Sequence, residues 1–293
     1  MSIAGAVTGT VVLLLRRVKA IPRRAFVFLW ALPLLRFFIP FGVGSRYGLM
    51  SLISRFTSRS VVVYEAKGEL SFTMMNHVMA SNRYFPIEYK TDILADAFHI
   101  AALIWAVIAS AIIIAFCIIY FTTLGALKNA EHFKENIYFS DKIDTPAVVG
   151  VIRPRIILPL SCRGSDLTYI LLHERTHIKR GDNLLRIIGF ICAAIHWFDP
   201  LVWVFLRCFL SDLELACDEG VLAGCGEDEK KKYALALLDF KESKNAFISA
   251  FGGAKLKVRI ENILSFKKMT FVSAVGFSLF AAVIAYLLLT NAA

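Results

Sequence analysis

Two histidines and a glutamate stand close together in the segment DLTYILLHERTHIKR, which runs from Asp166 to Arg180. His173 and His177 are four residues apart, and in a helix this spacing places both imidazoles on one face, able to bind one zinc ion. Glu174 adjoins the first histidine, where it can accept a proton from water that zinc activates. The pattern predicts a hydrolytic zinc centre. The alternative is a surface helix with two solvated histidines and a glutamate.

Catalytic zinc usually has three protein ligands and one open position, so a third ligand is required from elsewhere in the chain. The best candidate is Glu214, within the segment DLELACDE that runs from Asp212 to Glu219. Asp218 lies four residues beyond Glu214 on the same helical face, so it can orient one of the ligand histidines. Asp212 and Glu219 compete with Glu214, and each of these four acidic residues can instead be ordinary surface charge.

The elements that must position these residues can be read from the neighbouring sequence. The motif helix has Ser165 or Asp166 as its N-cap, basic residues in its last turn and Gly181 as its stop. Before it, the apolar runs 147–151 and 155–158 are separated by Arg153-Pro154, which predicts a strand pair or an edge strand with a turn. A helix and a small sheet are therefore expected to carry the first half of the site.

The composition indicates a membrane protein. Of the 293 residues, 57% are hydrophobic and 19% are charged, and the mean hydropathy is +0.63; this excludes a disordered chain or a nucleic-acid-binding arm. The net charge of +10 comes from basic residues that flank the apolar blocks, where Lys and Arg report membrane topology. The six cysteines include no C-x-x-C pair, so neither a disulfide framework nor a thiolate zinc site is expected.

Four apolar blocks are predicted to span the membrane, at about 3–15, 25–43, 97–124 and 269–289. The basic cluster between the first two places that loop in the cytoplasm and the N-terminus outside. Residues 128–268 then lie in the cytoplasm, and the chain ends outside.

A fifth apolar stretch, 187–210, is interrupted by His196 and by Asp199-Pro200. Proline breaks a helix, and each half is too short to span, so a re-entrant or interfacial helix pair is expected. The shared metal ion requires the same conclusion, since a crossing here would put His173 and Glu214 on opposite sides of the membrane.

The expected fold is an α-helical multi-pass membrane protein with about four transmembrane helices and a cytoplasmic gluzincin-like zinc protease domain of helices and a small strand pair. We expect residues 1–126 to form a membrane region with three spans and an outer loop at about 44–96. Residues 127–268 would form the protease domain, with the helix pair at 187–210, and residues 269–293 the last transmembrane helix.

Several segments together resemble one family, the beta-lactam-sensing antirepressors of Gram-positive bacteria, which are membrane metallopeptidases of the penicillinase and methicillin-resistance sensor-transducer type. The segments are 153–159, 173–182, 196–203, 212–222 and 259–264. The resemblance implies zinc held by His173, His177 and Glu214, with Glu174 as the base. The spacing from Glu214 to Asp218 is also similar to that of the prenyl-protein proteases, another class of membrane gluzincins.

The resemblance further implies cleavage of a transcriptional repressor, or of the chain itself, in signal transduction. The expected partners are a protein substrate that binds DNA and the lipid bilayer, with no direct contact to nucleic acid; a homodimer is compatible with the chain. A general protease for membrane proteins or peptides and a signalling scaffold without catalysis are the alternatives.

One departure from the family concerns antibiotic binding. The well-known receptors continue past the last span into an extracellular penicillin-binding domain, whereas this sequence ends at Ala293 and has no Ser-x-x-Lys motif in the segments expected outside. A stimulus is then expected to enter through the outer loop, a partner or the spans.

Overall fold

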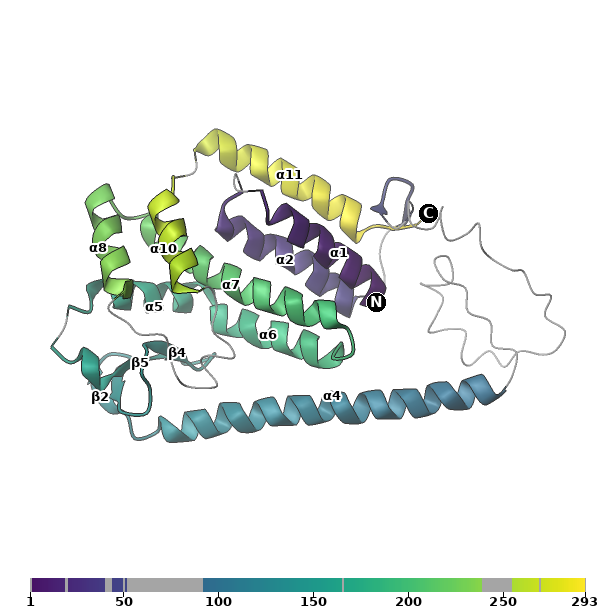
Figure 1. Cartoon of the computed structure of the whole chain (residues 1–293), viewed down its shortest axis with the longest axis horizontal. Helices are drawn as coiled ribbons and strands as arrows, with labels where there is room; N and C mark the ends of the chain where they lie inside the picture. The colour runs from purple at the N-terminus through teal and green to yellow at the C-terminus, as the bar shows by residue number, and fades with distance from the viewer. Residues whose placement is uncertain are drawn as a thin grey trace. The chain divides into compact units, whose positions relative to one another are not determined.

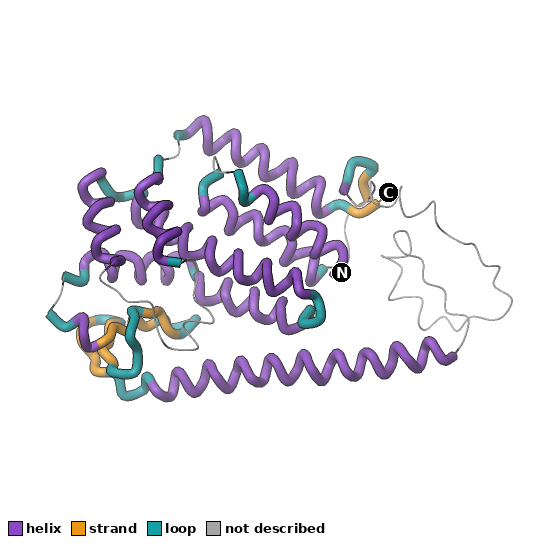
Figure 2. The backbone as a smooth tube through the Cα atoms, in the orientation of Figure 1, coloured by secondary structure: helices purple, strands orange, loops and turns teal. Residues whose placement is uncertain are grey.

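The computed structural model describes residues 2–18, 21–39, 44–49, 51, 92–164, 166–238, 255–268 and 270–292. The chain divides into two compact units. One combines Met1–Val12, Leu29–Val107 and Phe271–Ala293, and the other combines Leu13–Phe28 with Ile108–Thr270. Most of the outer loop expected at 44–96 lies outside the described residues. Helices dominate the described chain (Figure 2).

Among the described residues, two helices are long and apolar enough to cross a membrane, namely α4 (Asp92–Ala126) and α11 (Phe271–Leu289). Only 6% of the apolar window of each is buried, so their apolar side chains lack the protein cover that a soluble core would give them. They correspond to two of the four expected spans. The other two blocks form α1 (Ser2–Leu15) and α2 (Arg23–Phe38), with 14 and 16 residues, fewer than the ~20 of a typical span. For these two blocks, crossing stays a prediction.

In the first unit, a buried arginine of the apolar helix α2 donates hydrogen bonds to backbone carbonyls at the end of α11. Arg36 is buried, and its Nε and Nη2 donate hydrogen bonds to the carbonyls of Leu288 at 2.9 Å and Thr290 at 2.7 Å. The last carbonyls of a helix lack partners within the helix and carry the negative end of its dipole. The buried guanidinium therefore has hydrogen-bond acceptors although its surroundings are apolar.

In the second unit, a four-stranded sheet has the order β2-β3-β5-β4, with bounds Glu131–Lys134, Ile137–Ser140, Arg155–Pro159 and Ala147–Val149. The inner strand β5 carries the buried run from Ile156 to Leu158, as expected for a strand with neighbours on both sides. The antiparallel pair of β4 with β5 confirms the predicted strand pair, while β2 and β3 were not predicted.

The motif helix is α5 (Thr168–Arg180), and it packs against this sheet through Ile170. It begins one or two residues later than predicted, with Leu167 at the N-cap position, and the side chain of Asp166 accepts a hydrogen bond from the amide of Thr168 at 2.9 Å. Ser165 lies outside the described residues. The predicted stop is correct: Gly181 has φ of 69°, a left-handed conformation that glycine adopts without strain.

The apolar stretch at 187–210 forms a helix pair with a break where the sequence predicts it. Helix α6 (Asp182–Ile195) ends before His196, and α7 (Pro200–Leu222) begins after Asp199, whose side chain caps the amide of Leu201 at 2.9 Å. The two helices lie side by side (Figure 1). Gly189 permits this approach, since a Cβ there would come within 3.0 Å of a Leu206 methyl.

Two shorter helices also belong to the second unit: α8 (Glu227–Leu238) and α10 (Leu256–Ser265). They share one buried apolar cluster with the end of α7, which includes Val221, Leu222, Tyr233, Ala234 and Ile263. The far end of α7 is thus fixed by two helices that follow it in the chain.

Two acidic residues of α7 bind the segment that joins α1 to α2 and the first turn of α2. Asp212 is fully buried, and both its oxygens accept from Arg16 Nε at 2.9 Å. Glu219 accepts hydrogen bonds from the backbone amides of Arg23 at 2.9 Å and Arg24 at 3.0 Å, where α2 begins. Its carboxylate therefore acts as the cap of α2, at the positive end of the helix dipole.

We predict that Asp212→Ala lowers the free energy of unfolding by about 3 kcal/mol, because it leaves the partly buried Arg16 without its partner. Urea unfolding of the detergent-solubilised protein, followed by tryptophan fluorescence, measures this. The control is Asp141→Ala, whose ion pair with Lys142 is exposed, so the change should stay within about 0.5 kcal/mol. Equal stability of the two variants would contradict the prediction.

Candidate metal centre

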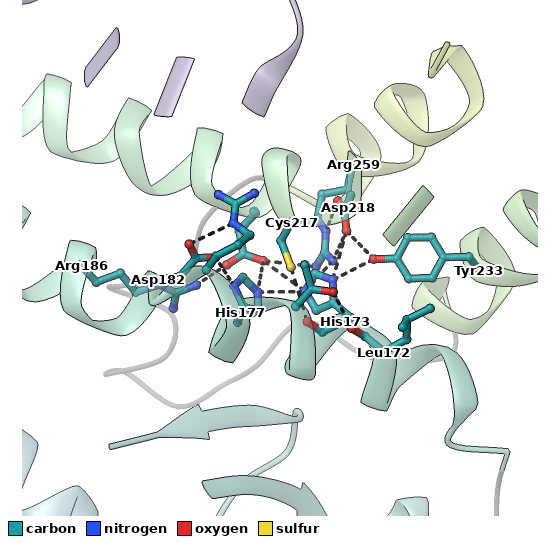
Figure 3. A network of polar contacts seen from close by, with 12 residues as sticks. Leu172, His173, His177, Asp182, Arg186, Cys217, Asp218, Tyr233 and Arg259 are labelled. Atoms are coloured by element: carbon teal, nitrogen blue, oxygen red, sulfur yellow. Dashed lines mark hydrogen bonds and ion pairs between the residues drawn. The ribbon is translucent and has the colours of Figure 1, made fainter. Parts of the chain in front are cut away.

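The predicted site residues come together in the second unit where α5 crosses α7 (Figure 3). Helix α5 supplies His173, Glu174 and His177, all of which are buried. Helix α7 supplies Glu214 and, one turn later, Asp218. The helix pair α6–α7 therefore returns the chain to α5, as the shared-metal argument requires.

The two imidazoles and the Glu214 carboxylate form a compact set of donors. The Nε2 atoms of His173 and His177 are 3.1 Å apart, and Glu214 Oε2 lies 3.7 Å from each of them. Two imidazoles and one carboxylate are a usual ligand set for catalytic zinc. The donor set therefore fits this ion.

The outer nitrogen of each imidazole is engaged, which leaves both Nε2 lone pairs facing inward. His177 Nδ1 donates to Asp182 Oδ2 at 2.6 Å. His173 Nδ1 lies 2.8 Å from the Tyr233 hydroxyl, which itself donates to Asp218 Oδ1 at 2.6 Å. Because the tyrosine proton goes to the carboxylate, Nδ1 must be the donor to the tyrosine oxygen. Such contacts fix the tautomer that a metal ligand requires.

The predicted role of Asp218 in orienting a histidine thus has a structural counterpart, with Tyr233 between the carboxylate and His173. Glu214 is oriented in a similar way, because Arg186 Nη2 hydrogen-bonds its Oε1 and leaves Oε2 toward the imidazoles.

The electrostatics of this region favour positive charge. Burial lowers the pKa of His173, but Cys217 and Glu214 beside it raise the value to about 9. Burial raises the pKa of Glu214, yet the two histidines and Arg186 hold it well below its usual range. The groups beside the histidines thus favour the positively charged form of the imidazoles. The same surroundings would favour a bound metal cation.

The competing carboxylates point to other partners. Asp212 is bonded to Arg16, and Glu219 caps α2, so neither faces the imidazoles. Of the acidic residues that the sequence singled out on α7, Glu214 alone has an oxygen placed between His173 and His177.

A profile of the family described as BlaR1 peptidase M56 matches residues 1–263, which is most of the chain. The chain belongs to the BlaR1 peptidase M56 family. The regulatory protein BlaR1 of Bacillus licheniformis is 32% identical over 152 residues, which are 46% of this chain and 25% of that protein. The methicillin resistance mecR1 protein of Staphylococcus aureus strain Mu50 is 28% identical over 117 residues, 39% of this chain and 20% of that protein. The match thus spans a quarter or less of these M56 relatives.

Sequence reasoning missed four residues that contact the donor set of this member of the M56 family: Asp182, Arg186, Tyr233 and Arg259. Asp182 had a local signal, since it directly follows the glycine stop of the motif helix. Arg259 lies in one of the segments that carry the family resemblance. Tyr233 had no signal in the sequence, because it stands 60 residues from the histidine that it contacts.

Cys217 was not expected near the metal site of the M56 chain, but its buried Sγ belongs to a cluster with ligand atoms of His173 and His177, all within 4.8 Å of one another. Burial raises its pKa, while the two histidines lower it, and the net result is a lowered value. The Cys217 thiol donates to the backbone carbonyl of His173 at 3.4 Å. Glu214 stays the predicted third ligand, since its Oε2 is equally close to both Nε2 atoms.

We predict that His173→Ala, His177→Ala and Glu214→Ala each lose bound zinc, because two remaining ligands hold the ion poorly. Cys217→Ser should retain one zinc per chain, measured by elemental analysis of purified protein. Replacement of zinc by Co²⁺ should give no thiolate charge-transfer absorption in the near ultraviolet. A strong band that disappears in Cys217→Ser would transfer the ligand role to Cys217.

Proposed function

We propose that this chain is a membrane-embedded zinc endopeptidase that acts on the cytoplasmic side and cleaves a transcriptional repressor, or itself, in a signalling pathway. The observation that supports it most is the position of Glu214 Oε2, 3.7 Å from both inward-facing Nε2 atoms of the His173 and His177 pair. Membership of a peptidase family supports hydrolysis over a structural metal site.

Each residue of the site has a task in peptide hydrolysis. His173, His177 and Glu214 would hold zinc, which when bound polarises the scissile carbonyl and lowers the pKa of water. Glu174 is buried beside the first ligand, where its carboxylate can accept a proton from the attacking water and later give it to the leaving amine nitrogen. Asp182 and Tyr233 keep the imidazoles in the tautomer with free Nε2 lone pairs.

The regulatory role rests on the relatives. The matched proteins are named regulatory protein BlaR1 and methicillin resistance mecR1 protein, and the similarity covers 46% and 39% of this chain. A repressor that binds DNA is the substrate we propose by this analogy. Genomic proximity to a small winged-helix repressor would favour regulation over general peptide processing.

The proposed topology has four spans, both termini outside and residues 128–268 in the cytoplasm. The high density of Lys and Arg in that segment supports it. The reversal at Asp199-Pro200 supports a helix pair that does not cross, because α6 and α7 lie side by side in one unit and bring Glu214 back to α5.

We predict that Glu174→Gln binds zinc as the parent does but loses cleavage of a co-expressed candidate repressor, since an amide cannot accept the proton. Zinc content and immunoblots of the repressor are the two measurements. The matched control is Glu135→Gln, because Glu135 pairs with Arg175 of α5 on the surface and should leave cleavage unchanged. Full cleavage by Glu174→Gln would remove Glu174 from the mechanism.

We also predict that reporter fusions after Ala130 and after Gly226 report the same, cytoplasmic side of the membrane. Alkaline phosphatase and green fluorescent protein, active on opposite sides, make a suitable pair of reporters. A fusion after Ala293 serves as the control and should report the outside. Opposite sides for Ala130 and Gly226 would show that the helix pair crosses, which would refute the topology.

A further inference from the structure

Arg259 places a guanidinium beside the donor set, from a part of the chain far from the zinc motif. It lies on α10, and its Nη2 is 3.2 Å from His173 Nε2 while its Nη1 is 3.7 Å from Glu214 Oε2. Figure 3 shows the side chain reaching from α10 toward the two histidines, with Asp218 beside it. The arginine is therefore on the inner, metal-facing side of the imidazole pair.

Asp218 fixes this guanidinium in position. Its Oδ2 accepts from Arg259 Nε at 2.9 Å and its Oδ1 from Nη2 at 2.8 Å, a bidentate pair in which the carboxylate is fully buried. Asp218 also accepts from Tyr233, so one carboxylate orients both the arginine and, through tyrosine, His173. Bidentate pairs of this kind fix orientation as well as charge.

The pair with Asp218 does not use all the donors of Arg259. A guanidinium carries five N–H groups, and the two hydrogen bonds to Asp218 occupy two of them. A third, on Nη2, faces His173 Nε2, the lone pair that the metal would take. When that lone pair is used for metal, this N–H and those on Nη1 remain for an anionic oxygen.

We propose that Arg259 is a catalytic residue that donates hydrogen bonds to the oxyanion formed on the scissile carbonyl; this rests on the proposed peptidase function. As water oxygen bonds to the carbonyl carbon, its proton passes to Glu174 and the C=O π pair moves to the carbonyl oxygen, beside Arg259. When the oxyanion collapses, the C–N bond breaks and the amine leaves with the proton from Glu174. The guanidinium, held by Asp218, stabilises this charge through its remaining N–H groups.

The test compares two probes on the full-length, zinc-loaded protein in detergent. An N-phosphoryl dipeptide imitates the tetrahedral oxyanion, whereas a peptide hydroxamate binds metal through planar oxygens. For Arg259→Gln we expect unchanged zinc content, hydroxamate affinity within a factor of about three, and phosphoryl-dipeptide affinity reduced by about 10²- to 10³-fold. Arg259→Lys keeps the positive charge and should recover part of that loss. Lys257→Gln, an exposed basic residue on the same helix, is the matched control.

The outcomes separate the two proposals. Equal loss of both probes, or loss of zinc from Arg259→Gln and Arg259→Lys, would make Arg259 a structural support and overturn the inference. Unchanged affinity for the phosphoryl dipeptide would overturn it as well. A parent protein that binds neither zinc nor either probe would instead refute the peptidase function itself.

Discussion

The close crossing of α5 and α7 is the contact on which the proposed metal centre depends. At Gly220 a Cβ would come within 2.9 Å of a Thr176 methyl, so the helices could not approach so closely with a larger residue there. The same approach lets the Cys217 thiol reach the carbonyl of His173. It also brings Glu214 between the two imidazoles, although more than thirty residues separate the motif from this ligand.

Four acidic residues lie around that crossing, and three of them pair with arginines. The carboxylates are Glu174, Asp182, Glu214 and Asp218, and the arginines that contact them are Arg180, Arg186 and Arg259. Carboxylates outnumber guanidinium groups, and buried charge is stable only when it is paired. A divalent ion held by His173, His177 and Glu214 would balance the excess of negative charge.

Local sequence patterns predicted the parts of the site that local chemistry determines. The four-residue histidine spacing, the Gly181 stop, the Asp199-Pro200 break and the four-residue step from Glu214 to Asp218 all depend on neighbouring residues along one helix. Tyr233 and Arg259 could not be predicted in this way, because they meet His173 across 60 and 86 residues of chain. The order of the strands could not be predicted either, because β3 pairs with β5 although β4 lies between them in the sequence.

Asp218 and Glu219 are successive residues of α7, yet they serve different structures. One carboxylate orients Arg259 beside the donor set, and the other holds the two backbone amides at which α2 begins. The residue that caps α2 and the residue that holds Arg259 in position are thus joined by a single peptide bond. A displacement of the first turn of α2 would therefore act directly on α7, one residue away from the carboxylate that holds Arg259.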